Sequence, residues 1–245
     1  MFILAHSKRS MKILVDIGNT SAKLVVSDNG EFVHFEHKSE PWRDLLRRLA
    51  VSYKLDEAVV STVVGDDLEF VEALRDLSVP CRYISCDTPC RSKTLQGIPE
   101  TYGADRLAAD YGAVAQDLNS TILVIDAGTC ITYDLISSDG RFLGGVISPG
   151  IQLRLNAMHD YTAKLPLVKA VKEAPLLSDN TIGNLMSGAV NGARMEIAGF
   201  VSKLSETYAD LHVFVTGGDG LDLSADVQCK VTYDPHLVFK GLDSI

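Results

Sequence analysis

The feature that most constrains the fold is an internal repeat. Residues 13–32 and 123–142 match without a gap when the first stretch is moved forward by 110 positions. Each stretch predicts a buried strand, a tight turn after an aspartate, a second strand, a turn at glycine and a third strand. Two hairpins can converge by chance, but an acidic residue ending a buried strand in both favours duplication of one α/β domain. The shift aligns five identical residues: Asp16 with Asp126, Gly18 with Gly128, Ser27 with Ser137, Gly30 with Gly140 and Phe32 with Phe142.

Helical and strand patterns alternate along the rest of the chain, as expected of an α/β protein. The stretch Trp42–Ser52 predicts an amphipathic helix with Leu45, Leu46 and Leu49 facing inward. Two domains are expected, 11–117 with the first turn and 118–245 with the second turn and a long helix, after an N-terminal extension of residues 1–10 and a natural start at Met11. Other expected elements are helices at 68–77, about 104–118 and 184–208, strands at 58–64, 81–85 and 212–215, and a polar, proline-rich loop at 86–100.

Composition and net charge argue against some classes of binding partner. The 245-residue chain is 46% hydrophobic and 22% charged, which is typical of a globular protein, and its formal net charge of −9 gives a pI near 5.1. An acidic chain of this kind is not expected to bind nucleic acid or an anionic membrane. No apolar run approaches membrane-spanning length, so no membrane segment is expected.

The cysteines do not form a disulfide pattern. Five are present, an odd and sparse number for a chain of this length. Cys81, Cys86 and Cys90 are close enough in sequence to suggest a zinc site, but a fourth ligand and the usual Cys-x-x-Cys spacing are missing. The alternative is three free thiols in and after a buried strand, in a reducing cytoplasm.

The first turn has the composition of a phosphate-binding loop. Gly18 lets backbone N–H groups approach a ligand, and Lys23 adds a positive charge on the following strand. Asp16, at the end of the strand, is suited to hold a hydrated Mg²⁺. The alternative is an ordinary Asn/Gly turn between strands. The polar side chains expected to donate to phosphate oxygens are Asn19, Thr20 and Ser21.

The second turn repeats this chemistry with Asp126, Gly128 and Thr129. One such turn alone could be structural. Two turns in duplicated positions, facing one another across a cleft, would hold a polyphosphate from both sides, so the repeat favours a nucleotide site.

Three further motifs have weaker signals. Asp105, in the motif Gly103-Ala104-Asp105-Arg106, is expected in the first turn of a helix, as a catalytic base beside a positive charge or as an ordinary helix-start aspartate. Thr216-Gly217-Gly218 follows a strand and would allow a ring to approach, although on this motif alone a plain turn is the better explanation. Asn180-Thr181 precedes the long helix as its expected N-cap.

Taken together and in this order, the motifs resemble those of type III pantothenate kinases, from about Met11 to about Phe239. The resemblance rests on Asp16-x-Gly-Asn-Thr-x-x-Lys, Gly-Ala-Asp-Arg, Asp126-x-Gly-Thr with Thr132-x-Asp134, and Gly144-Gly145-x-Ile147-x-Pro149-Gly150. It implies two duplicated ribonuclease-H-like domains, as in the superfamily of acetate and sugar kinases and actin. It also implies ATP-dependent phosphorylation of pantothenate to 4′-phosphopantothenate, the first step of coenzyme A biosynthesis, by a cytoplasmic homodimer.

The resemblance also implies roles for residues. Asp16 to Lys23 would bind ATP phosphates with Mg²⁺ near Asp16, and Thr129 would contact ATP. Asp126 would contribute to a monovalent cation site for K⁺ or NH₄⁺. Residues 103–106 would line the pantothenate pocket with Asp105 as proton acceptor, and Thr181 would reach pantothenate from the partner subunit.

This chain departs from the family pattern at three positions. Gln96 stands where many relatives have Tyr, Tyr102 where Leu usually precedes Gly-Ala-Asp-Arg, and Cys130 where Ala is usual. These departures bear on substrate contact more than on activity. Two alternatives are a kinase for another small hydroxyl substrate and a non-catalytic ATP-binding regulator on the same fold, which the presence of Asp105 disfavours.

Overall fold

The computed structural model describes residues 10–65, 67–219 and 229–245. The chain divides into two compact units. The first contains the chain up to Thr94, together with Ile98–Ala115 and Val238–Ile245, and the second contains Leu95–Gly97 and Gln116–Leu237. Each unit has its own five-stranded sheet and its own hydrophobic core.

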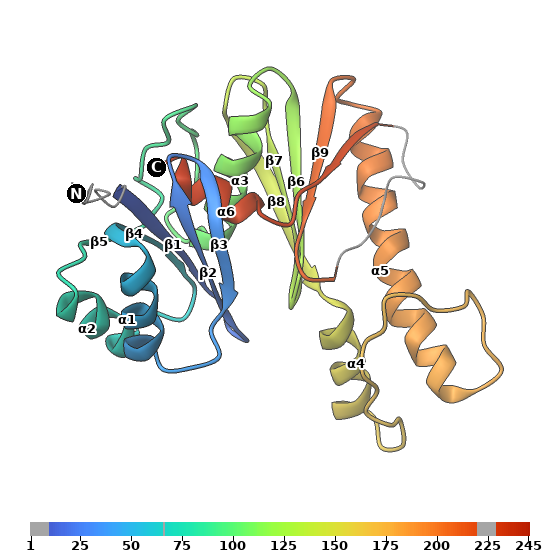
Figure 1. Cartoon of the computed structure of the whole chain (residues 1–245). Helices are drawn as coiled ribbons and strands as arrows, with labels where there is room; N and C mark the ends of the chain where they lie inside the picture. The colour runs from blue at the N-terminus through green and yellow to red at the C-terminus, as the bar shows by residue number, and fades with distance from the viewer. Residues whose placement is uncertain (1–9, 66, 220–228) are drawn as a thin grey trace, which may run out of the picture. The chain divides into compact units, whose positions relative to one another are not determined.

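The sheet of the first unit has the order β3-β2-β1-β4-β5 (Figure 1). Strands β1, β2 and β3 are antiparallel neighbours, whereas β4 and β5 run parallel to β1. The elements are β1 (Ser10–Ile17), β2 (Ala22–Asp28), β3 (Glu31–His37), α1 (Trp42–Ser52), β4 (Lys54–Thr62), α2 (Leu68–Asp76), β5 (Cys81–Tyr83), α3 (Ala104–Gln116) and α6 (Leu237–Asp243).

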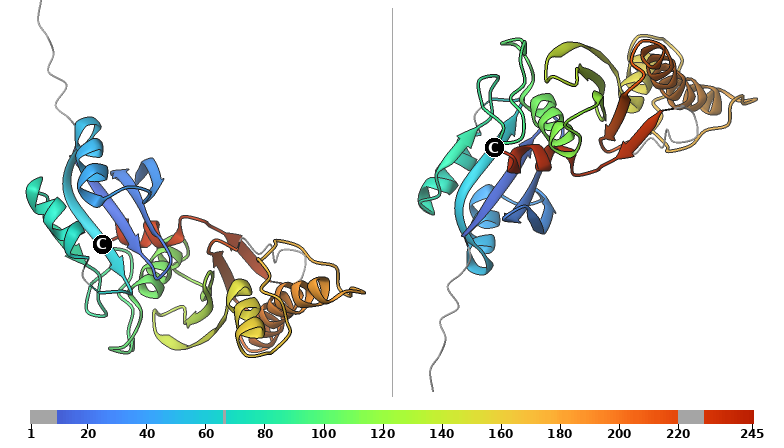
Figure 2. Two further views of the ribbon diagram at one scale, coloured as in Figure 1. Left: turned by 90° about the horizontal axis from the view of Figure 1, so that it is seen from below. Right: turned by 90° about the horizontal axis from the view of Figure 1, so that it is seen from above.

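The second sheet has the equivalent order β8-β7-β6-β9-β10, read from its antiparallel edge, with β9 and β10 parallel to β6. Helices α4 and α5 pack side by side in this unit (Figure 2). The shared order and directions confirm the α/β fold with two duplicated ribonuclease-H-like domains. The elements are β6 (Thr121–Ala127), β7 (Cys130–Ile136), β8 (Phe142–Pro149), α4 (Ile151–Asp160), α5 (Thr181–Ser205), β9 (Leu211–Thr216) and β10 (Lys230–Tyr233).

The strand registers show that the repeats correspond in space with one gap in each of them, although their sequences align without any. In the first turn, Ile17 pairs with Ala22, whereas Ala127 pairs with Ile131, so the second turn is one residue shorter. The next turn restores the alignment by being one residue longer in the second unit, and both of its glycines, Gly30 and Gly140, have positive φ. The second strand of the repeat is therefore displaced by one residue relative to the sequence alignment.

The core of the first unit explains why its first helix was predictable. Helix α1 has the predicted bounds, and it buries Trp42, Leu45, Leu46 and Leu49 as its periodicity indicates. The Trp42 indole N–H donates to Asp67 Oδ2 at 2.7 Å, which satisfies the one polar group of this buried ring.

Several predicted boundaries were wrong. Strand β4 ends at Thr62 and not at residue 64, because Val63 and Val64 are exposed. Helix α5 begins at Thr181, three residues before the predicted start, whereas the predicted N-cap is confirmed: the Asn180 side chain accepts a hydrogen bond from Gly183 N at 2.9 Å. The predicted helices at 68–77, 104–118 and 184–208 end at Asp76, Gln116 and Ser205.

The C-terminal segment lies in the first unit, whereas the predicted domain division placed all of 118–245 in the second. Lys12 Nζ donates to Asp243 O at 3.2 Å, and Ser244 O accepts from Arg91 N at 3.0 Å. Phe239 packs edge-on against Phe35, with 5.9 Å between ring centroids. These partners are distant in sequence, so no local pattern indicates them.

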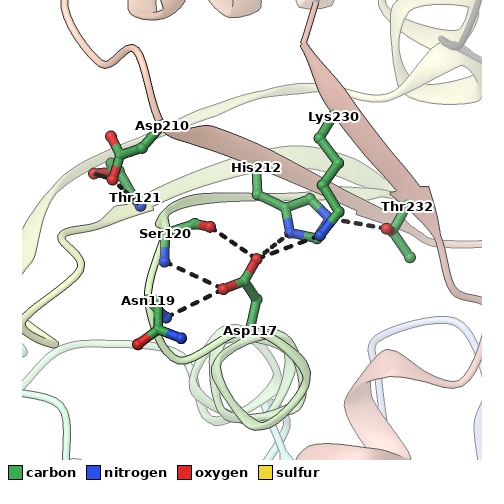
Figure 3. Close-up of polar contacts among 8 residues, drawn as sticks. All are labelled: Asp117, Asn119, Ser120, Thr121, Asp210, His212, Lys230 and Thr232. Atoms are coloured by element: carbon green, nitrogen blue, oxygen red, sulfur yellow. Dashed lines mark hydrogen bonds and ion pairs between the residues drawn. The ribbon is translucent and has the colours of Figure 1, made fainter.

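A polar cluster joins the starts of the parallel strands in the second unit (Figure 3). Asp117 Oδ2 lies 2.7 Å from His212 Nδ1 and accepts from the Ser120 hydroxyl at 2.8 Å, while Lys230 Nζ is 3.5 Å away. A carboxylate can only accept, so His212 Nδ1 is the donor. With neutral imidazole, His212 Nε2 then accepts from the Thr232 hydroxyl at 2.8 Å. The cluster fixes β9 and β10 against the segment that enters β6.

The three clustered cysteines differ in environment. Cys81 is exposed on β5, so its prediction as part of a buried strand was wrong, and the strand itself ends at Tyr83 and not at residue 85. Cys86 is half-buried, whereas Cys90 is buried beside the hydroxyls of Ser92 and Ser244. None of the helices in the described parts of the chain has the length and apolar character needed to cross a membrane.

Candidate functional site

The first phosphate-type turn joins β1 to β2. Asp16 is the penultimate residue of β1, and it pairs with Lys23 on β2 and with Ser61 on β4. Directly paired residues present their side chains on the same face of a sheet, so the three side chains are neighbours. The turn is closed by Gly18 N, which donates to Ser21 O at 3.0 Å. Its polar residues Asn19, Thr20 and Ser21 are exposed, as a ligand-binding turn requires.

The carboxyl group of Asp16, beside this turn, has a raised pKa. Burial is the main cause, and the negative charge of Asp105 adds to it, so that the pKa of Asp16 rises to about 6 although Lys23 opposes the shift. The structure thus brings together the predicted Mg²⁺ residue, the predicted phosphate-binding lysine and the predicted base in one unit.

Asp105 lies in the first turn of α3. Its Oδ1 accepts from the N–H of Arg106 at 2.8 Å, which fixes the carboxylate at the start of the helix. The helix itself begins with the hydrogen bond from Leu107 N to Gly103 O, at 3.0 Å. The guanidinium of Arg106 lies over the ring of Tyr102, with Cζ 4.4 Å from the ring centroid. The motif therefore presents a carboxylate and a guanidinium from consecutive residues.

The second phosphate-type turn joins β6 to β7. Asp126 pairs with Thr132 on β7 and with Thr216 on β9, so its neighbours are two threonines where Asp16 has a lysine and a serine. Gly128 N closes the turn by donating to Cys130 O at 3.0 Å, and Thr129 is exposed. A carboxylate among hydroxyls provides the oxygen ligands that hard cations prefer.

Two glycines that sequence reasoning did not connect with this turn hold it in place. A Cβ on Gly150 would lie 2.1 Å from Gly128 O, and a Cβ on Gly217 would lie 2.3 Å from Ala127 O. Gly150 N also donates to Thr129 O at 3.0 Å. Of the two interpretations of Thr216-Gly217-Gly218, the φ of +102° at Gly217 and its contact with Ala127 support the plain turn after a strand.

Asp219 is a further residue beside the second turn that sequence analysis did not assign to the site. Its backbone N–H donates to Ala127 O at 3.0 Å, and its side chain accepts from the backbone N–H of Ile151 at the start of α4. Burial raises the pKa of Asp219, and that hydrogen bond opposes the increase. The signal that could have found it is its position directly after the glycine pair.

The remaining predicted residues lie apart from these turns in sequence. Thr181 is exposed as the first residue of α5 in the second unit. Gln96 belongs to the second unit through its backbone, since its N–H donates to Gly140 O and its carbonyl accepts from Phe142 N, both at 2.9 Å. The roles of Thr181 and Gln96 toward a substrate stay predictions.

Comparison with known proteins gives one family. The sequence profile described as type III pantothenate kinase matches residues 12–203. A type III pantothenate kinase of Bacteroides fragilis is 37% identical over 235 residues, covering 96% of this chain and 97% of the relative. One of Phocaeicola vulgatus is 36% identical with the same coverage.

Solved structures share the fold at lower identity. A putative 2-dehydro-3-deoxygalactonokinase from Sinorhizobium meliloti has a TM-score of 0.59 at 16% identity, covering 94% of this chain and 96% of that one. A putative Baf family transcriptional activator from Campylobacter jejuni has a TM-score of 0.57 at 22% identity, covering 94% of each chain. At such identities the likeness concerns the fold alone.

Proposed function

The chain belongs to the type III pantothenate kinase family, and we propose that it transfers the γ-phosphoryl group of ATP to pantothenate. The products are ADP and 4′-phosphopantothenate, at the first step of coenzyme A biosynthesis, and we expect the enzyme to act in the cytoplasm. The observation that supports this reaction most directly is the gathering of Asp16, Lys23 and Asp105 in one unit. Phosphoryl transfer needs cations for the phosphates and a base for the hydroxyl, and these residues provide both functions.

Asp16 is proposed to hold Mg²⁺ through water. The residues fit a divalent cation, because burial and the charge of Asp105 both disfavour the ionised form of Asp16, and Lys23 and Ser61 offset them only in part. When bound, the ion would supply positive charge to the β- and γ-phosphates. Lys23 and the exposed turn that begins at Gly18, with Asn19 and Thr20, would bind the same phosphates.

Asp105 is proposed as the catalytic base. The Arg106 N–H holds the carboxylate by one oxygen at 2.8 Å, and the carboxylate would orient the primary hydroxyl of pantothenate and accept its proton late in the transfer. Gly103, Ala104 and Arg106 would line the pocket for that substrate, with the guanidinium as its positive group.

The second turn is proposed to bind ATP through Gly128 and Thr129 and a monovalent cation through Asp126. The side chains of Thr132 and Thr216 lie beside Asp126 and would add oxygen ligands for K⁺ or NH₄⁺. The close packing of Gly150 and Gly217 supports a rigid site, since neither glycine leaves room for the turn to shift toward it.

We also propose a homodimer formed through α5. Helix α5 carries small residues at Gly188, Ala189, Gly192 and Ala193, a spacing that permits close contact between helices. They divide into two faces, because Ala189 and Ala193 are buried in the core of the second unit. Apart from the adjoining residues of α5 itself, no atom of the described residues lies within 4 Å of a Cβ built on Gly188 or Gly199, and Met195 between them is 60% exposed. This second face would receive the partner subunit, whose Thr181 would contact pantothenate.

The function is tested by incubating the purified chain with Mg·ATP and K⁺ and with pantothenate, glucose or acetate in parallel. ADP release and the mass of the product are measured, with Asp105→Asn as the control for contaminating kinases. We expect phosphorylated pantothenate and no phosphorylated sugar or acetate. A sugar or acetyl phosphate without phosphopantothenate would indicate another kinase, and ATP binding without any product would indicate a regulator.

A further inference from the structure

Three contacts hold Tyr102 in place, one through its backbone and two through its side chain. Its backbone N–H donates to Pro99 O at 3.0 Å, and its hydroxyl donates to Asp110 Oδ2 at 2.7 Å. Asp110 is fully buried on α3, two turns after the start of the helix. The face of the ring is covered by the guanidinium of Arg106, with Cζ 4.4 Å from the centroid. The ring is therefore fixed at both ends while its face is occupied by a cation.

Because Asp110 is fully buried, its side chain depends on hydrogen bonds from neighbouring residues. Removing a polar group from water is unfavourable unless hydrogen bonds within the protein replace the lost hydration. The Tyr102 hydroxyl is one of the donors that Asp110 requires, so rotation of the ring would leave the carboxylate without it. The ring therefore has one strongly preferred orientation.

That orientation determines where the next positive charge lies. An arginine side chain loses considerable conformational freedom when it is confined, and a guanidinium over an aromatic face is favoured by the quadrupole of the ring. Arg106 follows Asp105 directly, and the carboxylate of Asp105 accepts from its N–H. A guanidinium held over Tyr102 is thus kept at a constant position relative to the carboxylate of the proposed base.

We propose that Tyr102, anchored by Asp110, is a positioning residue that holds Arg106 ready to bind the anionic substrate. The inference rests on the proposed function, in which Arg106 contacts pantothenate. Tyr102 itself touches no reacting atom in this scheme. Its effect is on the affinity for pantothenate and not on ATP or on the chemical step, since the orienting contact is made before the substrate binds.

The test is a kinetic double-mutant cycle on the full-length enzyme. Tyr102→Leu removes both the anchor and the aromatic face, and we expect the KM for pantothenate to rise roughly 2- to 30-fold, the range that cation–π energies allow. The KM for ATP and kcat should stay within about twofold. In an Arg106→Ala background the same substitution should have no further effect, because the group that it positions is absent.

Two further variants make the result specific. Tyr102→Phe keeps the ring but loses the hydrogen bond to Asp110, so its KM for pantothenate should lie between those of wild type and Tyr102→Leu. If the leucine variant does not fold, the KM of the phenylalanine variant is the measurement that decides. Tyr111→Phe is the matched control, since it removes a buried hydroxyl of the same helix that donates to Thr88 O at 2.7 Å. It should leave the KM for pantothenate unchanged.

The outcomes separate this inference from the proposed function. An unchanged KM for pantothenate in folded Tyr102 variants, or an equal effect in the Arg106→Ala background, overturns the positioning role while the wild-type reaction stands. A rise in the KM for ATP of the same size would also overturn it, because it would indicate general damage. A wild-type enzyme inert toward pantothenate would overturn the proposed function and the role of Tyr102 with it.

Discussion

Asp16 is expected to destabilise the ligand-free protein at neutral pH. Its pKa is raised from an ordinary value of 3.8 to about 6, chiefly by burial and then by the charge of Asp105. The folded state therefore binds the proton more tightly than the unfolded chain does. Folding is favoured by this group while it is protonated, and that advantage is lost as the pH rises from about 4 to above 6. Above pH 6 the folded protein carries an ionised carboxylate in an unfavourable place.

The size of the effect follows from the two pKa values. The cost of ionising Asp16 in the folded state is about 3 kcal/mol, since each pKa unit corresponds to about 1.4 kcal/mol. Asp16→Asn keeps the shape and removes the charge. We expect the variant to be more stable than wild type by up to about 3 kcal/mol at pH 8, and the difference should nearly vanish at pH 4, where Asp16 is protonated.

The assay is urea denaturation in EDTA between pH 4 and 8, with turnover measured on the same preparations. Asp87→Asn, an exposed substitution in the same unit, is the control and should show no such dependence on pH. Mg·ATP should stabilise wild type more than the variant, and the variant should lose turnover. A variant that is equally or less stable than wild type at pH 8 would refute the reasoning, because ionised Asp16 would then be well solvated.

Three further outcomes concern the proposed roles. Asp105→Asn should lower turnover by roughly 10²–10⁴-fold with ATP affinity unchanged in calorimetry, and near-normal turnover would exclude Asp105 as the base. Wild-type turnover should be higher in K⁺ than in Na⁺, and Asp126→Ala should remove the difference; equal wild-type rates in both salts would contradict the cation site. Light scattering at micromolar concentration should give twice the chain mass, and a monomer mass would contradict both the dimer and the role of Thr181.

The elements that sequence predicted well are those with strong local patterns. Helix α1 shows a three-to-four-residue apolar spacing, and its bounds were predicted to the residue. The two hairpins were found through the repeat, since buried strands before Asp16 and Asp126 carry continuous apolar runs. Helix α4 was missed because only Ile151 and Leu155 are buried along it, so its amphipathic signal is weak.

The part of the site that sequence could not supply depends on contacts between distant segments. Nothing near Asp16 in the chain indicates that Asp105 lies close enough to raise its pKa. The packing of Gly150 and Gly217 against the second turn likewise joins segments that are separate in sequence. Tyr102 was noted only as an unusual residue, and its role becomes apparent when Asp110 and Arg106 are found around it.

The polar cluster at Asp117 gives a last prediction, of opposite sign to that for Asp16. Burial alone would raise the pKa of Asp117, but hydrogen bonds from His212, from the Ser120 hydroxyl and from nearby backbone N–H groups lower it well below its usual range. The folded state therefore releases this proton more readily than the unfolded chain. The stabilisation is complete above the ordinary value of 3.8 and is lost as the pH falls through the folded-state pKa.

Asp117→Asn should therefore destabilise the protein at pH 7 by about 1–3 kcal/mol, the usual contribution of hydrogen bonds to a charged group. The deficit should shrink as the pH is lowered toward 3, which urea denaturation midpoints at several pH values will measure. Asp139→Asn is the matched control: Asp139 also accepts from a serine hydroxyl, that of Ser137, but its side chain is 68% exposed, so its loss should change stability little. Equal effects of the two substitutions at pH 7 would mean that the cluster around His212 contributes no more than a surface contact. A deficit for Asp117→Asn that stays constant with pH would show that its charge is not what stabilises the junction of β6, β9 and β10.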